Sequence, residues 1–256
     1  MKIGAYQFAV SGNINHNMEI IKKAIIQASR EGVRLLVFPE CALTGYPPRD
    51  MDKASLADFD ELSLAYAELQ RMAADYAICL IVGTITGENG VHYNSAIIFS
   101  PHQDKRIYHK RALWGWDRDN FNIGNEDGIF EIDGLKVGVR ICFEVRFPEF
   151  FRELYKSQTD LNIILFYDVS DCDDVDRYEL IKAHIRTRAV ENVTYTLTVN
   201  SIYPYQTAPT AFYDKSGYPL MELKRNEEKL LIFDWKNEQA DFGEQGRKEI
   251  SDWLSC

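Results

Sequence analysis

The sequence predicts an α/β protein in which helices cover the faces of β-sheet. Two observations support this prediction. Several segments of strand length carry alternating or continuous apolar residues, and three or four other segments repeat apolar residues at helical spacing. The pattern by itself does not separate one sheet from two stacked sheets.

The composition is that of an ordinary globular protein. The chain has 256 residues, of which 46% are hydrophobic and 27% charged, so it is long enough for a large core. It has no internal repeat, no low-complexity tract and no linker rich in Gly, Pro or Ser. We therefore expect one domain over residues 1–256.

The first half of the chain alternates between strands and helices. An apolar helical stripe over residues 15–31 ends at Gly32, and a second helix is predicted over 55–76. The dipeptide Asn89-Gly90 is typical of a hairpin turn between two strands. The predicted strands of this half are 2–10, 34–40, 77–84 and 93–100.

The second half repeats the same mixture. Asp133-Gly134 indicates another hairpin, and helices are predicted over 146–157 and 175–191. An acidic run before the second of these helices, at 171–176, would complement the positive N-terminal end of its dipole. The predicted strands are 129–132, 136–142, 161–166, 194–201, 210–214 and 229–235.

Charge and apolar patterning limit the partners and the compartment. The formal net charge is −10 with a pI near 5.1, which argues against nucleic acid or an anionic membrane as partner. The apolar stretch Ile3–Val10 is shorter than a signal peptide requires, and no segment approaches the ~18 apolar residues of a membrane span. We therefore expect a cytoplasmic protein.

The cysteines raise the question of a reactive thiol. The chain has an odd number of them and no C-x-x-C pair, so we expect neither disulfides nor a structural zinc site. Five histidines and the acidic run at 171–176 show no converging ligand spacing, and we expect no metal and no cofactor. The five cysteines are Cys41, Cys79, Cys142, Cys172 and Cys256.

Three polar side chains are candidates for chemistry. Cys142 follows the apolar run 137–141, where a strand gives way to a turn before a helix, and such a junction frees backbone N–H groups. Glu40 follows another apolar run, after Pro39, at a strand end of the kind where α/β proteins place their sites. Lys110 lies in the basic run 106–111, which taken alone indicates a solvated face. Each of the three has an ordinary structural interpretation when it is considered singly.

Taken together, these residues resemble the nitrilase superfamily, the carbon–nitrogen hydrolases. The blocks LLVFPECALTGY, YHKRALWGWDRDNFNIGN and GVRICFEVRFPEFFREL are similar to its three signature regions and occur in the same order. The opening strand, the segment RTRAVENVTYTLTVNS and the turn DKSGYPL agree as well, so the resemblance covers nearly the whole chain.

The resemblance implies an α-β-β-α sandwich of two stacked mixed sheets and a Glu–Lys–Cys triad. Glu40 would be the general base, Lys110 the ammonium beside the developing oxyanion, and Cys142 the nucleophile that forms a thioester. The backbone N–H of Phe143 would be a second oxyanion donor. The implied reaction is hydrolysis of a small amide or N-carbamoyl compound by water, with an amidase favoured over a nitrilase. The implied assembly is a homodimer or a higher homo-oligomer.

The chain also departs from the family pattern. Many members carry a second glutamate between the lysine and the cysteine, and here the nearest candidate is the shorter Asp117. The loop after strand 161–166 reads Tyr167-Asp168, and we expect both residues at the pocket, where the Asp168 carboxylate would favour cationic or neutral substrates. Trp114 follows Lys110 closely and is expected to wall the same cavity.

Other activities remain open on the same fold. A non-catalytic binding protein would keep the architecture without the chemistry. A glutaminase or an acyltransferase serving a partner would keep the thioester, and the segment LTGYPPRD resembles glutaminase domains of NAD synthetases. The residues do not name the substrate.

Overall fold

The computed structural model describes residues 1–236 and 238–254 and contains two stacked six-stranded sheets. The first sheet has the strand order β14-β1-β2-β3-β4-β5, and the second has the order β13-β12-β10-β8-β7-β6. Both sheets mix parallel and antiparallel pairs, because β1–β2–β3 and β7–β8–β10 are parallel while the flanking strands are antiparallel. A small sheet pairs β9 with β11.

The N-terminal half of the chain builds most of the first sheet. The Asn89-Gly90 dipeptide forms the predicted hairpin between β3 and β4, which pair along nine positions from Leu80 to Glu88. The elements are β1 Lys2–Gln7, α1 Ile14–Arg30, β2 Val33–Val37, the 3-10 helix η1 Ala54–Leu56, α2 Phe59–Asp75, β3 Cys79–Glu88, β4 Val91–Ser100, β5 Gln103–His109 and α3 Asp117–Asn120.

The C-terminal half builds the second sheet and returns one strand, β14, to the first. The Asp133-Gly134 turn joins β6 and β7 as predicted. The elements are β6 Ile129–Ile132, β7 Leu135–Ile141, the 3-10 helix η2 Cys142–Arg146, α4 Pro148–Lys156, β8 Leu161–Phe166, β9 Val169–Ser170, α5 Val175–Asn192, β10 Tyr195–Asn200, β11 Tyr205–Gln206, β12 Ala211–Tyr213, β13 Pro219–Glu222, β14 Lys229–Asp234 and α6 Phe242–Leu254.

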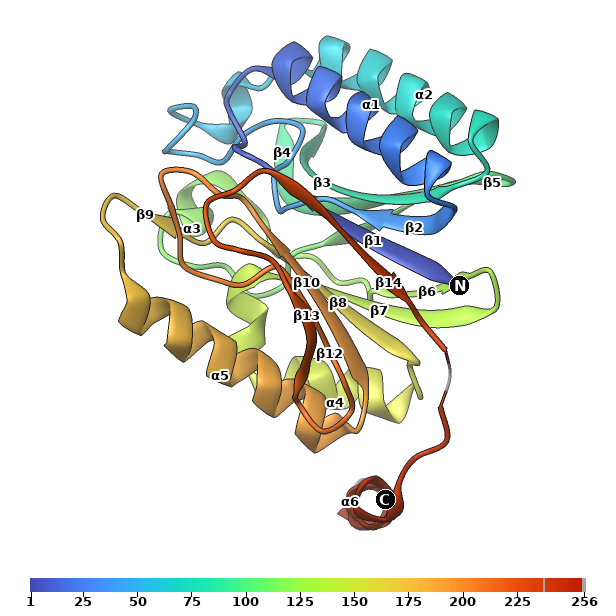
Figure 1. The fold of residues 1–256 in the computed structure, drawn as a ribbon. Coiled ribbons are helices and arrows are strands. Elements are labelled where there is room, and N and C mark those ends of the chain that lie inside the picture. Colours follow the sequence, from blue (N-terminus) through green and yellow to red (C-terminus); the bar gives the residue numbers. More distant parts are fainter. Residues whose placement is uncertain (237, 255–256) are drawn as a thin grey trace.

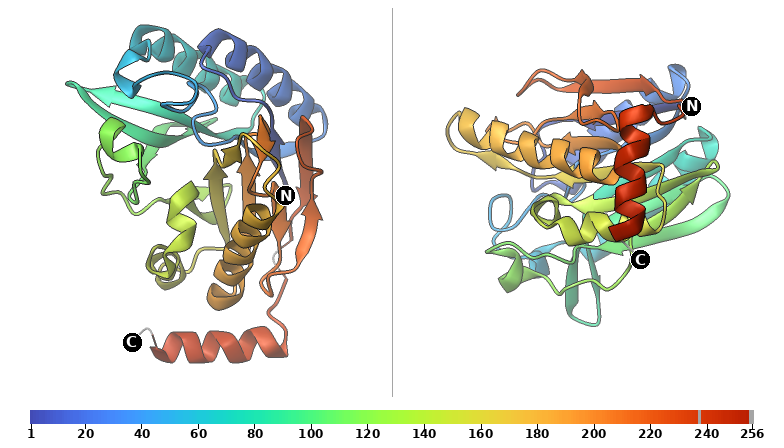
Figure 2. Two further views of the ribbon diagram at one scale, coloured as in Figure 1. Left: turned by 90° about the vertical axis from the view of Figure 1, so that its left-hand side faces the viewer. Right: turned by 90° about the horizontal axis from the view of Figure 1, so that it is seen from below.

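The layers follow the order helix, sheet, sheet, helix. Helices α1 and α2 cover the outer face of the first sheet, and α4 and α5 cover the outer face of the second (Figure 1). Helix α6 runs across the end of the α4–α5 layer, as both views in Figure 2 show. This arrangement confirms the predicted α-β-β-α sandwich.

Side chains alternate between the two faces of each strand and so divide the core into a layer between the sheets and a layer under the helices. Ile3, Ala5, Leu35 and Val37 point between the two sheets, and their neighbours along each strand, including Leu36, point toward α1 and α2. This period of two is the pattern that predicted the strands. Both faces of the first sheet are therefore filled by its own apolar residues.

Short polar side chains cap the N-termini of the long helices. Asn13 accepts the N–H of His16 at the start of α1, and Asp58 accepts that of Glu61 at the start of α2. Asp174 accepts the N–H of Arg177 at the start of α5. Such caps satisfy backbone donors that have no partner within the helix, and they set the point at which each helix begins.

The structure corrects several local predictions. The helix expected over 146–157 is α4, which begins at Pro148, whereas the 3-10 helix η2 before it was not predicted. The basic run 106–111, predicted as a solvated face, lies largely in β5, and Lys110 is buried. Helix α6 was not predicted from the sequence. In the described part of the chain, no helix is long and apolar enough to cross a membrane.

Candidate active site

Glu40 follows β2 and is almost fully buried, with 1% of its surface exposed. Its Oε1 accepts hydrogen bonds from Asn94 Nδ2 at 2.7 Å and Lys110 Nζ at 2.8 Å, and its Oε2 accepts one from the Tyr167 N–H at 2.8 Å. Donors from three separate segments therefore hold both carboxylate oxygens. Burying a charged group is costly unless it is hydrogen-bonded, and these donors satisfy both oxygens of the Glu40 carboxylate.

A glycine in β3 makes room for the segment that carries Glu40. A Cβ built on Gly83 would lie 2.1 Å from the Pro39 carbonyl oxygen and 2.6 Å from the Cα of Glu40. Those atoms belong to the backbone and cannot move aside cheaply. Only glycine at this position allows the end of β2 to lie so close to β3.

Lys110 follows β5 and forms a buried ion cluster. Its Nζ lies 2.8 Å from Glu40 Oε1 and 2.7 Å from Asp117 Oδ2, and all three side chains are at most 1% exposed. Asp117 also accepts hydrogen bonds from Tyr46 Oη at 2.6 Å and the Trp114 N–H at 3.0 Å. Because an ammonium group has three N–H donors, one remains free for another acceptor.

The cluster holds one more negative than positive charge. Burial raises the pKa of Glu40 above its ordinary value of 4.5, Lys110 opposes that rise, and Asp117 adds to it. Burial alone would lower the pKa of Lys110, but the two carboxylates together raise it well above 10.5. Lys110 therefore stays protonated, and Glu40 takes up a proton more readily than an exposed glutamate does.

Cys142 lies next to this cluster, at the junction of β7 and η2. Its backbone φ of 45° is in the left-handed region, which is unusual for a residue other than glycine and marks a sharp turn. Burial raises the pKa of its thiol well above 9.0, and the Glu40 charge raises it further while Lys110 opposes both. The thiol is therefore protonated at neutral pH and needs a base to become a nucleophile.

A second buried glutamate fixes the turn that carries Cys142. Glu144 accepts the Ile141 N–H at 2.6 Å on Oε2, and the Arg111 N–H at 2.6 Å and Tyr108 Oη at 2.8 Å on Oε1. It thereby joins the turn after β7 to the strand end that bears Lys110. Phe143, the second residue of η2, presents a backbone N–H at a position where helical donors have no partner one turn back.

Two adjoining cavities open beside Cys142. Their volumes are about 200 Å³ and about 330 Å³, and they share the walls formed by Trp114, Cys142, Asp168 and Arg177. Lys110 also lines the larger one. A molecule in these cavities would meet both the thiol and the ammonium.

The aromatic residues that were expected near the pocket do lie there. Trp114 is 50% exposed, and its ring centroid lies 6.0 Å from that of Phe143 and 6.4 Å from that of Trp116. Tyr167 stacks on Tyr46 at 5.2 Å. Trp114 is thus a wall of the cavity rather than part of the core.

Asp168 lines both cavities as expected, but its negative charge is paired. Its carboxylate is 6% exposed, and it accepts two hydrogen bonds from Arg177, at 2.7 Å from Nε and 2.9 Å from Nη2. Thr207 donates a further bond to the same carboxylate. A carboxylate that is neutralised by its own neighbour attracts a cationic substrate less than an unpaired one would, which argues against the predicted preference.

Four further residues hold this region together and were not predicted from the sequence. Asn94 interrupts an apolar strand, and a buried amide at such a position signals a specific partner. Glu144 lies two residues after Cys142 in a buried turn, and Tyr46 lies in a loop that the pattern left unassigned. Arg177 belongs to the first turn of α5, and its sequence neighbours give no sign of its partner Asp168.

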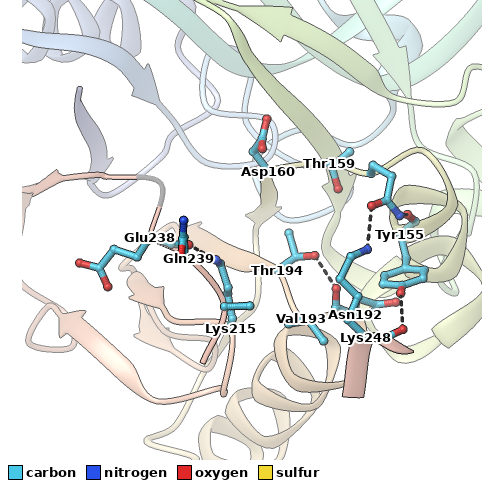
Figure 3. Close-up of a pocket in the computed structure, with 12 residues that line it drawn as sticks. Tyr155, Thr159, Asp160, Asn192, Val193, Thr194, Lys215, Glu238, Gln239 and Lys248 are labelled. Carbon is cyan, nitrogen blue, oxygen red and sulfur yellow. Dashed lines mark hydrogen bonds between the residues drawn. The ribbon is translucent and has the colours of Figure 1, made fainter. Parts of the chain in front are cut away.

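Another cavity, of about 370 Å³, lies at the opposite end of the second sheet (Figure 3). Asp160 and Thr194 line it just before β8 and β10 begin, whereas Cys142 lies at the other ends of the strands. Its walls include none of the residues predicted for the site. The cysteines 41, 79, 142 and 172 are free, and Cys256 lies outside the described residues.

Comparison with known proteins agrees with this geometry. The carbon–nitrogen hydrolase family model matches residues 2–241. The 2-oxoglutaramate amidase of Bacillus subtilis is 31% identical over 205 residues, which cover 77% of this chain and 75% of that protein. A glutamine-dependent NAD(+) synthetase of Xylella fastidiosa is 32% identical over 146 residues, which cover 54% of this chain but only 26% of that protein.

Solved structures share the fold. An amidase from Nesterenkonia sp. AN1 superposes with a TM-score of 0.82 at 24% identity, covering 99% of both chains. A glutamate-to-glutamine variant of that amidase carries the acetamide moiety of fluoroacetamide covalently attached to its active-site cysteine. The two stacked sheets, the buried cluster beside a cysteine and the family match over residues 2–241 lead to one conclusion: this chain belongs to the carbon–nitrogen hydrolase family.

Proposed function

We propose that this protein is an amidase that cleaves a small amide through a thioester at Cys142. The observation that supports this proposal best is the buried cluster of Glu40, Lys110 and Asp117 next to the Cys142 thiol at a cavity wall. The cluster supplies a base for a thiol that is protonated at neutral pH, and a cation for an oxyanion. The named activity of the Bacillus subtilis relative is consistent with this reaction.

The first half of the reaction forms the acyl-enzyme. Glu40 takes the thiol proton as the sulfur of Cys142 attacks the amide carbon, giving a tetrahedral intermediate with a negative oxygen. Glu40 then delivers that proton to the nitrogen, the carbon–nitrogen bond breaks, and ammonia leaves. In the second half Glu40 accepts a proton from water, whose oxygen attacks the thioester carbon. The carbon–sulfur bond then breaks, the acid leaves, and Glu40 returns the proton to the sulfur of Cys142.

Two donors are available for the negative oxygen. The third N–H of Lys110 is not used by Glu40 or Asp117, and Lys110 lines the larger cavity. The Phe143 N–H lies beside the thiol at the start of η2. We assign Asp117 a positioning role, since it holds the Lys110 ammonium beside Glu40 and has no part in the proton transfers assigned to Glu40.

The test combines turnover with covalent labelling. Cys142→Ala is expected to abolish ammonia release from a panel of small amides while the protein stays folded by circular dichroism. Treatment of the wild type with fluoroacetamide is expected to add one acetamide moiety at Cys142, measured by peptide mass spectrometry. Cys172→Ala is the matched control, because Cys172 is exposed and lies outside both cavities.

Other outcomes would favour other functions. Turnover that survives in Cys142→Ala would overturn the thiol mechanism. A wild type that binds amides but neither acylates nor turns them over would be a binding protein on the same fold. Glutamine hydrolysis that appears only with a partner would indicate a glutaminase, the activity suggested by the similarity to NAD synthetases.

We also propose that the chain acts as a single-domain cytoplasmic homodimer. The crowding of Phe147, Phe150 and Phe151 in the sequence suggests a contact face on the helices around 146–157 and 175–191, but Phe151 is buried and Arg111 and Arg140 stack on Phe150. Helix α6 offers a better surface, because large apolar side chains on it are exposed. These are Phe242, Ile250, Trp253 and Leu254. Light scattering at micromolar concentration should give the dimer mass, and a strict monomer would exclude this assembly.

A further inference from the structure

We propose that the larger cavity beside Cys142 holds the amine side of the substrate, and that the favoured leaving group is an aromatic amine rather than ammonia. This inference rests on the proposed amidase function and adds a leaving group to it. The cavity measures about 330 Å³. A single water molecule, which is close to ammonia in size, needs only roughly 10–15 Å³ of such space. The cavity therefore has room for a substituted amine.

The position of the base decides which side of the amide faces this cavity. Glu40 delivers its proton to the amide nitrogen, and Glu40 is held by the Lys110 ammonium and the Tyr167 N–H. Lys110 and Tyr167 both line the larger cavity. The nitrogen and its substituent therefore point into the larger cavity. The smaller cavity, of about 200 Å³ and with a mostly apolar lining, is left for a short acyl group.

The wall of the larger cavity carries exposed aromatic rings. Trp114 and Trp116 are nearly parallel, with 8° between their planes and 6.4 Å between their centroids, and Phe143 continues the series at 6.0 Å from Trp114. Trp114 is 50% exposed and Trp116 is 59% exposed, so about half of each indole is open to solvent. Aromatic rings pair at centroid distances of about 4.5–7 Å, and a flat ring on the substrate can extend this series.

The two indoles are held in place by residues of the reaction centre. The Trp114 N–H donates to Asp117 Oδ2 at 3.0 Å, and the same oxygen accepts the Lys110 ammonium at 2.7 Å. The Trp116 carbonyl accepts Asn120 Nδ2 at 3.0 Å. A stacking surface that is ordered before the substrate arrives loses little conformational freedom on binding, so more of the contact energy contributes to affinity.

The charges around the larger cavity favour a neutral or cationic amine over an anionic one. Asp174, which caps α5, adds a carboxylate to the lining, and the faces of the indoles attract cations. The three cations of the lining are all paired with carboxylates: Lys110 with Glu40 and Asp117, Arg49 with Asp171 at 2.8 Å, and Arg177 with Asp168 at 2.7 Å.

The chemical step keeps the balance of acyl transfer. The sulfur of Cys142 attacks the carbonyl carbon, the carbon–nitrogen bond breaks, and the nitrogen leaves as the aromatic amine with the thiol proton that Glu40 delivers. The thioester keeps only the acyl group, so amides with one acyl group and different amines form the same intermediate. Differences in kcat/KM among such amides therefore report on the amine side.

The experiment compares amides that share the acetyl group. The released ammonia or amine is measured for acetamide, N-methylacetamide, N-benzylacetamide and N-(cyclohexylmethyl)acetamide. The kcat/KM of the benzyl amide should exceed that of acetamide by about 10–100-fold, as burial of one ring allows. It should exceed that of the cyclohexylmethyl amide by about 2–10-fold, because a flat ring stacks on the indoles and a puckered ring of the same size does not. A carboxylate on the benzyl ring should remove most of this gain.

Variants of Trp116 make the result specific. Trp116→Leu keeps an apolar side chain without the ring, and the benzyl to cyclohexylmethyl ratio of kcat/KM should fall to about 1. Trp116→Phe keeps a flat ring and should retain part of the ratio. Tyr218→Leu is the matched control and should leave the ratio unchanged, because Tyr218 is 62% exposed and lines a different cavity. The phenylalanine variant keeps the test decisive if Trp116→Leu does not fold.

The two proposals fail in different ways. If the wild type hydrolyses none of these amides and no acetyl group is found on Cys142, the proposed function is wrong. If acetamide is hydrolysed at least as fast as N-benzylacetamide, the amine site is overturned and the amidase assignment stands. A wild-type ratio of benzyl to cyclohexylmethyl amide near unity, or a ratio that both Trp116 variants keep, would likewise overturn the site.

Discussion

Two buried glutamates lie on either side of the Lys110–Arg111 segment, and their partners differ. Glu40 shares its carboxylate with the Lys110 ammonium, an amide side chain and one backbone N–H. Glu144 receives only neutral donors, the Tyr108 hydroxyl and two backbone N–H groups. Both side chains are at most 1% exposed, so burial does not distinguish them.

This difference in partners indicates that Glu40, and not Glu144, is the buried carboxylate suited to proton transfer. The three donors of Glu144 all belong to the framework, and they use the carboxylate to join the turn after β7 to the end of β5. Glu40 faces a cation and a thiol, and the second carboxylate, Asp117, raises its pKa. A group that is poised between two protonation states can transfer a proton, whereas a group held by neutral donors stabilises one geometry.

The largest expected effect separates the two glutamates directly. Glu40→Gln should lower kcat by about 10²–10⁴-fold, because it removes the general base while keeping the size of the side chain. Glu144→Gln should instead lower the free energy of unfolding by about 1–3 kcal/mol, since its new amide group faces a backbone donor. Ammonia release and urea denaturation measure the two effects. Similar losses of kcat in Glu40→Gln and Glu144→Gln would contradict the assignment of Glu40 as the base and Glu144 as a structural residue.

Lys110 and Arg111 are neighbouring cations whose removal should affect kcat differently. Lys110→Met should lower kcat by about 10²–10³-fold or more, as expected for removing one oxyanion donor. Arg111→Met should be mild, because Arg111 pairs with Glu153 and stacks on Phe150 at the molecular surface. Single-turnover kinetics on purified variants would measure both. Equal losses would mean that Lys110 is not the cation at the reaction centre.

A pH profile tests whether the charge of Asp117 tunes Glu40. Since the pKa of Glu40 is raised above 4.5, kcat/KM for a neutral amide should fall as pH decreases, with a midpoint above 4.5. The loss should approach tenfold per pH unit below that midpoint. Asp117→Asn removes a charge that raises this pKa, so its profile should shift to lower pH. A midpoint that stays unchanged would show that the two carboxylates do not act as a coupled set.

The smallest expected effect concerns a third buried carboxylate, Asp168. Its partner is Arg177, so Asp168→Asn should release an unpaired positive charge into the cavity. The ratio of kcat/KM for succinamate to that for neutral butyramide should then rise by a few-fold, on the order of one exposed charge contact. Ammonia release from the two amides, and from cationic 4-aminobutanamide, measures this change. A selective loss of 4-aminobutanamide hydrolysis would instead restore the role that the sequence suggested for Asp168.

The sequence by itself determined the features that depend on neighbouring residues. Alternating and continuous apolar runs predicted the strands, and Asn89-Gly90 and Asp133-Gly134 predicted their hairpins. The apolar runs before Glu40 and Cys142 predicted that both lie at strand ends. These signals are local, because backbone geometry is set within a few residues.

Only the tertiary structure decided which side chains meet. Asn94 lies 54 residues from Glu40 in sequence and the Tyr167 N–H lies 127 residues away, yet both hold the same carboxylate. The ion pair that neutralises Asp168 likewise depends on how the turns after the strands approach one another. Strand patterns specify the direction and face of each residue, but the partner of a buried charge is set by the packing of distant segments. The charge of the cavity follows from that packing.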